Sequence, residues 1–318
     1  MIKRTLYFGN PAYLSTQNEQ LVIRLPEVVN NKEIPEVFQK EAVERIPIED
    51  IGILVLDHTR ITLTSGLLEK LILNNVALIQ CGQNHLPIAA TLHFDINDTF
   101  SEKIHYQLRA SEPLKKQLWK QTIEAKILNQ AAVLQILGHD ATALLHHAKN
   151  VSSGDPDNRE GRAAAKYWET LLKPYGVTRG QNEGPPNQFF NYGYALLRAV
   201  IARNLVASGC LPVVGIHHRN KYNAFCLADD IMEPFRPIVD LYIFRYLATL
   251  PSLPENLEKT HKGHLLQIPV LDTLIDGKNS PLLVGAQRTT ASVMKCFMGE
   301  TRKILYPILY AEITKTNT

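Results

Sequence analysis

The sequence predicts an α+β protein in which an N-terminal β-sandwich is followed by an all-helical C-terminal domain. Before about residue 90, short apolar and β-branched runs are separated by Asn, Pro and Gly, which is typical of strands. From Ser101 onward, apolar residues recur at helical spacing instead. The length of 318 residues also favours about two domains. We therefore expect domains at residues 1–95 and 101–318, with the boundary near residues 97–99.

The N-terminal part contains several predicted strands and one predicted helix. The helix spans residues 66–74, and Ser65 is its expected N-cap because a hydroxyl there can accept a hydrogen bond from the first turn. The expected strands are residues 6–8, 20–25, 52–57 and 76–81.

The C-terminal part is expected to be helical throughout. Leu118, Ile123, Ile127 and Leu134 recur at helical spacing, and no signal of comparable strength predicts a β-hairpin in this part. The other expected helices are residues 141–148, 163–172, 192–207, 229–250 and 289–306, with loops at 150–159 and 176–187.

Charge is unevenly distributed along the chain. Residues 1–100 hold 8 Lys and Arg against 12 Asp and Glu, which gives −4, so the remaining residues carry +7 of the total of +3. A basic second part hints at a surface that binds a polyanion, although chance explains the asymmetry about as well.

Cysteine usage and the N-terminus predict a cytoplasmic protein with no membrane partner. The four cysteines are far apart and form no CxxC pair, which is typical of reduced thiols in the cytosol. The N-terminus lacks the apolar core of a signal peptide. The longest charge-free stretch near the middle, residues 204–218, is too short to span a bilayer.

The densest group of polar residues lies between Gly215 and Pro237. A strand-like run over residues 211–216 leads into two histidines, and a helix is expected to open at residue 227 or 228. In that helix Asp230 and Glu233 are three residues apart and share a face. Stabilisation by the helix dipole would explain acids in the first turn, but it does not explain Glu233 in an apolar surround.

A carboxylate pair beside one imidazole is a ligand set that suits Mg²⁺ or Mn²⁺. The candidate third ligand is Glu160, which lies at a loop-to-helix junction before a run of small residues. An isolated glutamate at a helix start is more often a solvated cap. Spacing alone does not join Glu160 to His218.

Several segments closely resemble the CRISPR spacer-acquisition integrase family, also called the universal CRISPR adaptation endonuclease, and above all its type II branch. The specific motifs are Glu-Gly-x-Ala-Ala, His-x11-Asp-x2-Glu and Met-Glu-Pro-Phe-Arg-Pro. The resemblance covers nearly the whole chain. The segments are NREGRAAAKYW at 158–168, GPPNQFFNYGYALLRA at 184–199, GIHHRNKYNAFCLADDIMEPFRPIVD at 215–240, LVLDHTRITLTSGLLEKL at 54–71 and LWKQTIEAKILNQA at 118–131.

The resemblance implies a metal-dependent DNA endonuclease and integrase. Its members insert short foreign DNA fragments into a CRISPR array, because the 3′-hydroxyl of the fragment attacks a phosphodiester at the repeat end. The family also implies a catalytic C-terminal domain, an N-terminal domain for dimerisation and partner binding, and homodimers bridged by a small dimeric CRISPR-associated partner subunit. The substrates would be double-stranded DNA, both the incoming fragment and the repeat.

The same resemblance assigns residues. Glu160, His218 and Glu233 would hold one Mg²⁺ or Mn²⁺, with Asp230 as the neighbouring catalytic acid that orients His218 or a water. His218 is preferred to His217, which is expected to pack or to form a hydrogen bond. The candidate contacts to DNA phosphates are Arg162, Lys166, Arg219, Lys221, Arg236 and Arg245.

Purely structural roles are also possible for some of these residues. Arg236 could pair with Asp240 four residues on, and Tyr192 and Tyr194 are expected in the core. Three other functions also remain open: a metal-dependent hydrolase of RNA or of a phosphoester metabolite, a non-catalytic nucleic-acid-binding module, and a structural assembly subunit.

Overall fold

The computed structural model describes residues 3–26, 43–83, 87–91, 93, 99–180 and 184–310. The chain divides into two compact units, Met1–Ile96 and Asn97–Thr318. Strands fill the first unit and helices dominate the second, which confirms the mixed class predicted from the sequence.

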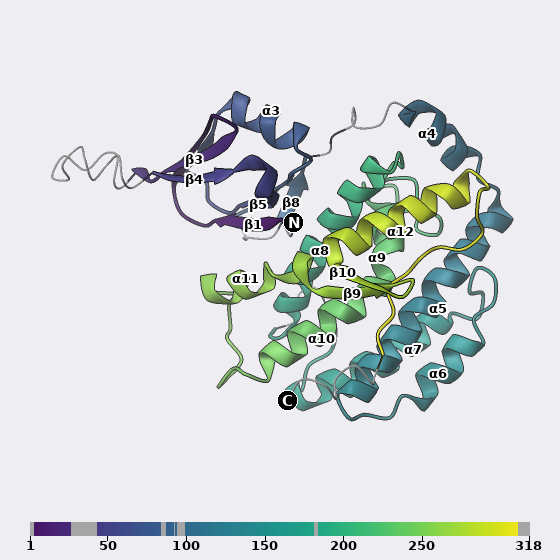
Figure 1. Ribbon diagram of the computed structural model, residues 1–318. Helices are drawn as coiled ribbons and strands as arrows, with labels where there is room; N and C mark the ends of the chain where they lie inside the picture. The colour runs from purple at the N-terminus through teal and green to yellow at the C-terminus, as the bar shows by residue number, and fades with distance from the viewer. Residues whose placement is uncertain are drawn as a thin grey trace. The chain divides into compact units, whose positions relative to one another are not determined.

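The N-terminal unit contains two four-stranded sheets, drawn in purple and blue in Figure 1. Helix α3 (Ser65–Leu73) begins after Thr64, not Ser65, because the Thr64 hydroxyl accepts a hydrogen bond from the Leu67 amide. The first sheet has the order β1 (Arg4–Phe8), β5 (Ile51–Leu56), β7 (Ala77–Cys81), β8 (Pro87–Ala90), and the second has the order β4 (Glu44–Pro47), β3 (Gln20–Arg24), β2 (Ala12–Gln17), β6 (Ile61–Leu63).

One apolar core serves both sheets of this unit. Leu14 and Leu21 from the second sheet, Leu54 from the first and Leu67 and Leu71 from α3 belong to the same buried cluster. Strand β5 is buried at all six positions, because both faces of the strand are covered by other parts of the unit. This burial is the main source of stability in the unit.

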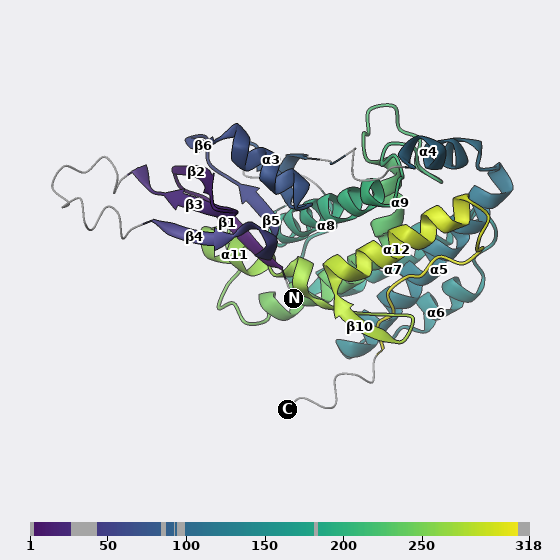
Figure 2. The same cartoon turned by 45° about the horizontal axis from the view of Figure 1, so that its top comes forward.

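The helical unit is built around two long buried helices, α5 (Glu112–Ile136) and α8 (Asn187–Ala207). Helices α6 and α7 lie beside α5 in both views (Figures 1 and 2). The other helices are α4 (Phe100–Arg109), α6 (Thr142–Lys149), α7 (Arg159–Leu172), α9 (Cys226–Met232), α10 (Arg236–Leu247), α11 (Lys259–Leu265) and α12 (Leu282–Phe297), with short 3₁₀ turns η1 (Ile48–Asp50) in the first unit and η3 (Lys173–Tyr175), η4 (Glu233–Phe235) and η5 (Ile268–Val270) in the second.

The prediction of an all-helical second domain is wrong in one place. Strands β9 (Asp272–Ile275) and β10 (Lys278–Pro281) form an antiparallel hairpin. Its turn is Asp276-Gly277, with φ of 51° and 70°, and Asp-Gly is a strong signal for such a two-residue turn. The hairpin moves the following helix forward, so α12 starts at Leu282 and ends at Phe297 rather than spanning 289–306.

The predicted helix over 229–250 is three elements in the structure. Helix α9 ends at Met232, the 3₁₀ turn η4 follows, and α10 begins at Arg236. Pro234 and Pro237 supply no backbone N–H, so a continuous α-helical ladder through this segment is disfavoured.

The segment after α12 is tied to α5 by side-chain amides. Gln121 donates to the Arg302 carbonyl and accepts from the Ile304 amide, at 2.8 and 3.0 Å. The buried Asn129 amide donates to the carbonyls of Pro234 and Pro307, at 2.8 and 2.9 Å. Asn129 therefore holds the η4 turn, which carries Glu233, against α5.

Within the part of the chain that the structure describes, no helix is both long and apolar enough to cross a membrane.

Candidate active site

Glu160 is held in the first turn of α7 by a dense set of capping contacts. Asn158, at φ 51°, accepts the Gly161 amide at 3.1 Å. The Asp155 carboxylate accepts the amides of Arg159 and Glu160, each at 2.9 Å. Asn158 and Asp155 therefore satisfy the amides that begin the helix, and Glu160 itself is not the cap. Its carboxylate is left to face α5.

Asp230 organises the turn that carries the two histidines. Its carboxylate is fully buried and accepts the amides of Ile216, His217 and His218, at 2.7, 3.0 and 3.2 Å. A side chain at Gly215 would lie 2.4 Å from the His218 carbonyl, so the turn needs glycine there. The expected strand over 211–216 is absent, because the Leu211 amide binds the Gln107 side chain and the Ile216 amide binds Asp230 rather than a neighbouring strand.

The two histidine rings have different environments. His218 Nδ1 lies 2.6 Å from Asp230 Oδ1, and this bond raises the pKa of His218 although burial acts in the opposite direction. The contact leaves Nε2 as the ring nitrogen for another ligand. His217 stacks on buried Trp119, with ring centroids 4.1 Å apart, and burial lowers its pKa. The packing role predicted for His217 is confirmed.

Lys126 lies between two of the predicted ligands. Its ammonium is 2.5 Å from Glu160 Oε1 and 2.5 Å from Glu233 Oε2. Lys126 is 7% exposed and Glu233 is 5% exposed. Burial disfavours the charge on both groups. The carboxylates of Glu233 and Glu160 nevertheless hold the pKa of Lys126 above its usual value. Arg236 and Lys126 in turn hold the pKa of Glu233 below its usual value.

An ammonium between the buried Glu233 and the partly buried Glu160 marks a place where positive charge is stabilised. In this structure, no three His, Cys, Asp or Glu side chains among the described residues are gathered closely enough to hold a metal ion. The Lys126 ammonium instead fills the space between the carboxylates. Two carboxylates with one imidazole nitrogen nearby match the donor preferences of Mg²⁺ or Mn²⁺. The residues present therefore fit such an ion once Lys126 moves aside.

The candidate DNA contacts are dispersed over the helical unit. Five are exposed, and two of these are engaged in ion pairs, Lys166 with Glu169 and Arg219 with Glu112. Arg236 is mostly buried and its Nε lies 3.0 Å from Glu233 Oε1. The exposed five are Arg162, Lys166, Arg219, Lys221 and Arg245.

The suggested pair of Arg236 with Asp240 is wrong, because Arg236 pairs with Glu233. Asp240 instead accepts the hydroxyl groups of Tyr167 and Tyr194, at 3.0 and 2.5 Å. Tyr192 and Tyr194 are both buried, as predicted for core residues.

Asp240 makes the stability of the protein depend on pH. Burial raises the pKa of Asp240 to about 7, although the tyrosine hydroxyls oppose the rise. The folded protein then holds this proton more tightly than the unfolded chain, so stability falls as pH rises from about 4 to about 7. Asp240→Asn removes this loss, and its Tm should rise relative to the natural protein between about pH 5 and pH 8. A Tm difference that stays constant over this range would contradict the assignment.

Lys126 is the site residue that sequence reasoning missed. It lies seven positions after Trp119 and four before Gln130 on α5, on the face that those buried residues share. A lysine at a core-facing position is unusual unless its charge is paired. That pattern is the signal in the sequence, although it names neither Glu160 nor Glu233 as the partner.

Comparisons with known proteins identify the family of this chain. The family model of CRISPR associated protein Cas1 matches residues 6–277. A CRISPR-associated endonuclease Cas1 of Neisseria meningitidis serogroup C (strain 8013) is 36% identical over 269 residues, which cover 84% of this chain and 83% of that protein. A Pyrobaculum aerophilum protein of the same description is 26% identical over 226 residues, 66% of this chain and 75% of its own.

Solved structures share the fold. A casposase bound to integration product has a TM-score of 0.77 at 20% identity, over 100% of this chain and 96% of its own. A Cas1 protein from Thermotoga maritima has a TM-score of 0.70 at 14% identity, over 93% and 97% of the two chains. The resemblance noted in the sequence is confirmed, and since the family model spans most of the chain, this protein belongs to the CRISPR associated protein Cas1 family.

Proposed function

We propose that this chain is a metal-dependent DNA endonuclease and integrase that inserts short foreign DNA fragments into a CRISPR array. The observation that carries the proposal is the pairing of Glu160 and Glu233, from different elements, around one cationic group. The descriptions of its relatives support it, since the Neisseria protein is named an endonuclease and the casposase structure contains an integration product.

Glu160, Glu233 and His218 Nε2 would hold one Mg²⁺ or Mn²⁺. When bound, such an ion stabilises the negative charge that builds up on phosphorus and on the leaving oxygen as the 3′-hydroxyl attacks. In the reaction the new O–P bond forms as the bond to the leaving 3′-oxygen breaks, and that oxygen gains a proton in place of the one the attacking hydroxyl loses, so no nucleotide triphosphate is needed.

The chain's own residues would prepare this site before DNA arrives. Asp230 fixes the His218 ring by binding both the backbone of its turn and Nδ1. Asn129 holds the η4 turn in place from α5. Preorganisation of this kind keeps catalytic groups oriented without further cost during the reaction. The exposed basic residues would bind DNA through its backbone, because incoming fragments vary in sequence.

We further propose that the two sheets of the N-terminal unit form a β-sandwich for dimerisation and partner binding, and that the protein acts in the cytoplasm. Homodimers bridged by a small dimeric CRISPR-associated partner subunit would be the working assembly. In support, a solved complex described as Cas6-RT-Cas1–Cas2 has a chain that aligns with 98% of this one, with a TM-score of 0.68 at 16% identity.

The test is a strand-transfer assay with the purified partner subunit, a short duplex with free 3′-hydroxyls and a plasmid that carries a CRISPR repeat. We expect branched products joined at the repeat edge, which depend on Mg²⁺ or Mn²⁺. Degradation of RNA without such products would favour a hydrolase instead. Calorimetric titration with Mn²⁺ addresses the non-catalytic alternatives, since an absence of binding would favour a nucleic-acid-binding module or an assembly subunit.

Lys126→Met tests whether the lysine occupies the cation position. The variant leaves Glu160 without its ammonium partner and Glu233 with Arg236 alone, which costs at most about 3–5 kcal/mol of stability in EDTA. Mn²⁺ should then raise its Tm more than it raises that of the natural protein, where the ion must displace an ammonium. Lys120→Met on the same helix is the matched control, since Lys120 makes no contact with either carboxylate. Equal Mn²⁺ shifts in all three proteins would contradict the interpretation.

A further inference from the structure

A small cavity adjoins the carboxylate pair within the helical unit. Its volume is about 210 Å³, below the roughly 300–1,000 Å³ of sites that enclose a drug-sized ligand, so it suits a single chemical group. Lys126 and Arg236 line this cavity and also bind Glu233, so its wall is continuous with the candidate metal site. The remaining lining residues are Gln130, Trp168, Arg179, Gly180, Tyr194 and Asp240.

Arg179 forms no salt bridge with a described carboxylate, although its charge acts on Asp240 across the cavity. Its guanidinium donates to the Gly180 carbonyl and to Asn187 Oδ1, both at 3.1 Å. Its other contacts within the described residues are aromatic: it lies 5.4 Å from the ring centres of Trp168 and Tyr194. A half-buried guanidinium without a salt bridge is costly, and its fork of donors matches the oxygens of a phosphate.

The cavity wall holds three cationic side chains, Lys126, Arg179 and Arg236, and one acid, Asp240. Arg236 lies 4.6 Å from the Tyr194 ring, so two guanidinium groups contact one tyrosine. Asp240 is the one acid in the lining, and its raised pKa of about 7 leaves it only partly ionised at neutral pH. Both guanidinium groups therefore lie at the aromatic wall, and the cavity presents positive charge there.

Gln130 adds an independent observation. Its side chain is 2% exposed and lines the cavity, and its Oε1 has no hydrogen-bond partner among the described residues. A buried amide oxygen without a hydrogen-bond partner lowers stability, and a hydrogen bond to a bound polar group would restore that stability. The amide can turn by rotation of its last torsion, so its NH₂ can donate to an anion as well.

A wider hollow of about 760 Å³ shares Trp168 and Arg179 with this cavity. The small residues Gly161, Ala164 and Ala165 at the start of α7 line this hollow, and they leave room for a DNA strand to approach. Arg179 therefore lies where a backbone that follows α7 would pass from the open hollow to the carboxylate pair.

We propose that the cavity between Arg179, Arg236 and Gln130 is a phosphate-binding site that anchors a DNA strand at the Glu160–Glu233 centre. The inference rests on the proposed function for the identity of the strand. The group bound is either an internal phosphodiester or a terminal 5′-phosphate, and both have the same anionic oxygens.

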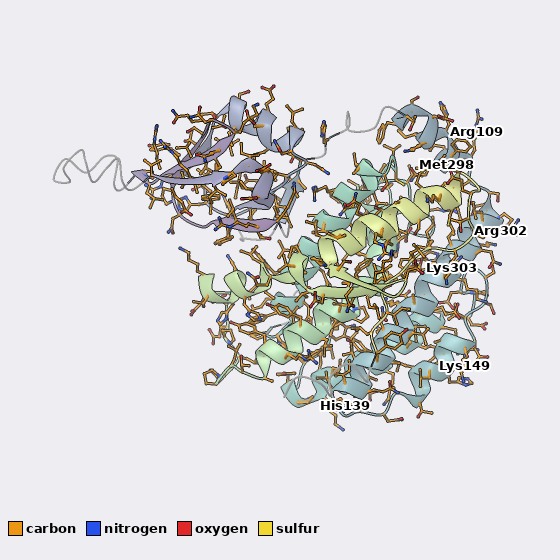
Figure 3. The ribbon with its side chains drawn as sticks, viewed as in Figure 1. Arg109, His139, Lys149, Met298, Arg302 and Lys303 are labelled. Carbon is orange, nitrogen blue, oxygen red and sulfur yellow. The ribbon has the colours of Figure 1, made fainter. Side chains whose placement is uncertain are left out.

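The test measures DNA binding without divalent cations, which separates it from strand transfer. Fluorescence anisotropy of a short duplex over a series of NaCl concentrations gives the salt dependence of affinity. Each lost phosphate contact lowers the slope of log K against log salt by about 0.9. We expect Arg179→Gln to lower the slope by this amount, and Arg179→Lys, which keeps the charge, to retain it. The control is Arg302→Gln at the exposed surface position labelled in Figure 3.

Duplexes with and without 5′-phosphates show whether the site binds an internal phosphodiester or a terminal 5′-phosphate. An equal loss on both assigns the site to a phosphodiester, and a loss only on the phosphorylated duplex assigns it to the terminus. If Arg179→Gln, Arg302→Gln and the natural protein share one slope, the proposal is wrong.

A second probe does not require DNA binding at all. Inorganic phosphate, compared with chloride at equal ionic strength, should raise the Tm of the natural protein and of Arg302→Gln more than that of Arg179→Gln. Equal shifts in all three, with no slope difference, overturn the phosphate site even if strand transfer occurs. Conversely, a loss confined to Arg179→Gln upholds the site even if the chain integrates no DNA.

Discussion

Glu160→Gln is expected to reduce strand transfer by at least 10²–10³-fold, on the order seen when a group that stabilises transition-state charge is removed. The amide keeps the shape of the side chain but loses the charge that would bind a divalent cation. His218→Ala should have a similar effect, because it removes the imidazole that lies beside Glu233. Duplex binding should change little, since neither residue is a cationic contact to DNA.

The measurement is the initial rate of strand transfer, together with duplex affinity by anisotropy and Tm for each variant. Glu169→Gln on the same helix is the control, because this exposed glutamate pairs with Lys166 and lies outside the carboxylate pair. It should retain the natural rate. If the site variants lose DNA binding and Tm together with activity, the assignment of Glu160 and His218 to the reaction fails.

Asp230→Ala is expected to be the most destabilising change at the site. It leaves the amides of residues 216–218 without their acceptor, and buried unsatisfied donors cost about 1–3 kcal/mol each. Asp230→Asn keeps the volume and some of the bonds, but a neutral amide cannot hold His218 as the carboxylate does. Strand transfer should then fall by about 10–100-fold, as for residues that orient a metal ligand.

Urea unfolding and strand-transfer rates separate the two effects of Asp230. The neighbouring Asp229 provides the control, because it pairs instead with Arg198 and Asn223. Asp229→Asn should retain more activity than Asp230→Asn. The same loss of activity in both variants would show that activity needs negative charge at the start of α9 and does not depend on the orientation of His218 by Asp230.

Local chemistry explains which features were predictable from the sequence. Strands β1, β3, β5 and β7 of the first unit and the main helices follow from periodicity, whereas β2, β4, β6 and β8 were not among the expected strands. The hairpin at residues 272–281 was missed although its Asp-Gly turn is present. The strand expected at 211–216 was wrong, because the Ile216 amide at its end binds Asp230 rather than a partner strand. The backbone conformation at Ile216 therefore depends on a side chain 14 residues away, which the local pattern of apolar residues does not predict.

The site depends on contacts that are remote in sequence. Motif resemblance assigned Glu160, Glu233 and His218, but Lys126 lies 34 residues before Glu160 and joins it only when α5 packs beside α7. Arg179 lies in a loop whose composition carries no such signal. Packing decides both placements, and spacing along the chain does not.

The central claim is that Glu160, His218 and Glu233 bind one divalent cation in the place that Lys126 occupies. Diffraction at a wavelength where Mn²⁺ scatters anomalously, from crystals of the full chain soaked in Mn²⁺, tests it most directly. The account predicts one strong anomalous peak within coordinating distance of all three side chains, with the Lys126 ammonium displaced from between the carboxylates. Mn²⁺ bound elsewhere, or Lys126 still bridging Glu160 and Glu233 in Mn²⁺-saturated crystals, would contradict it.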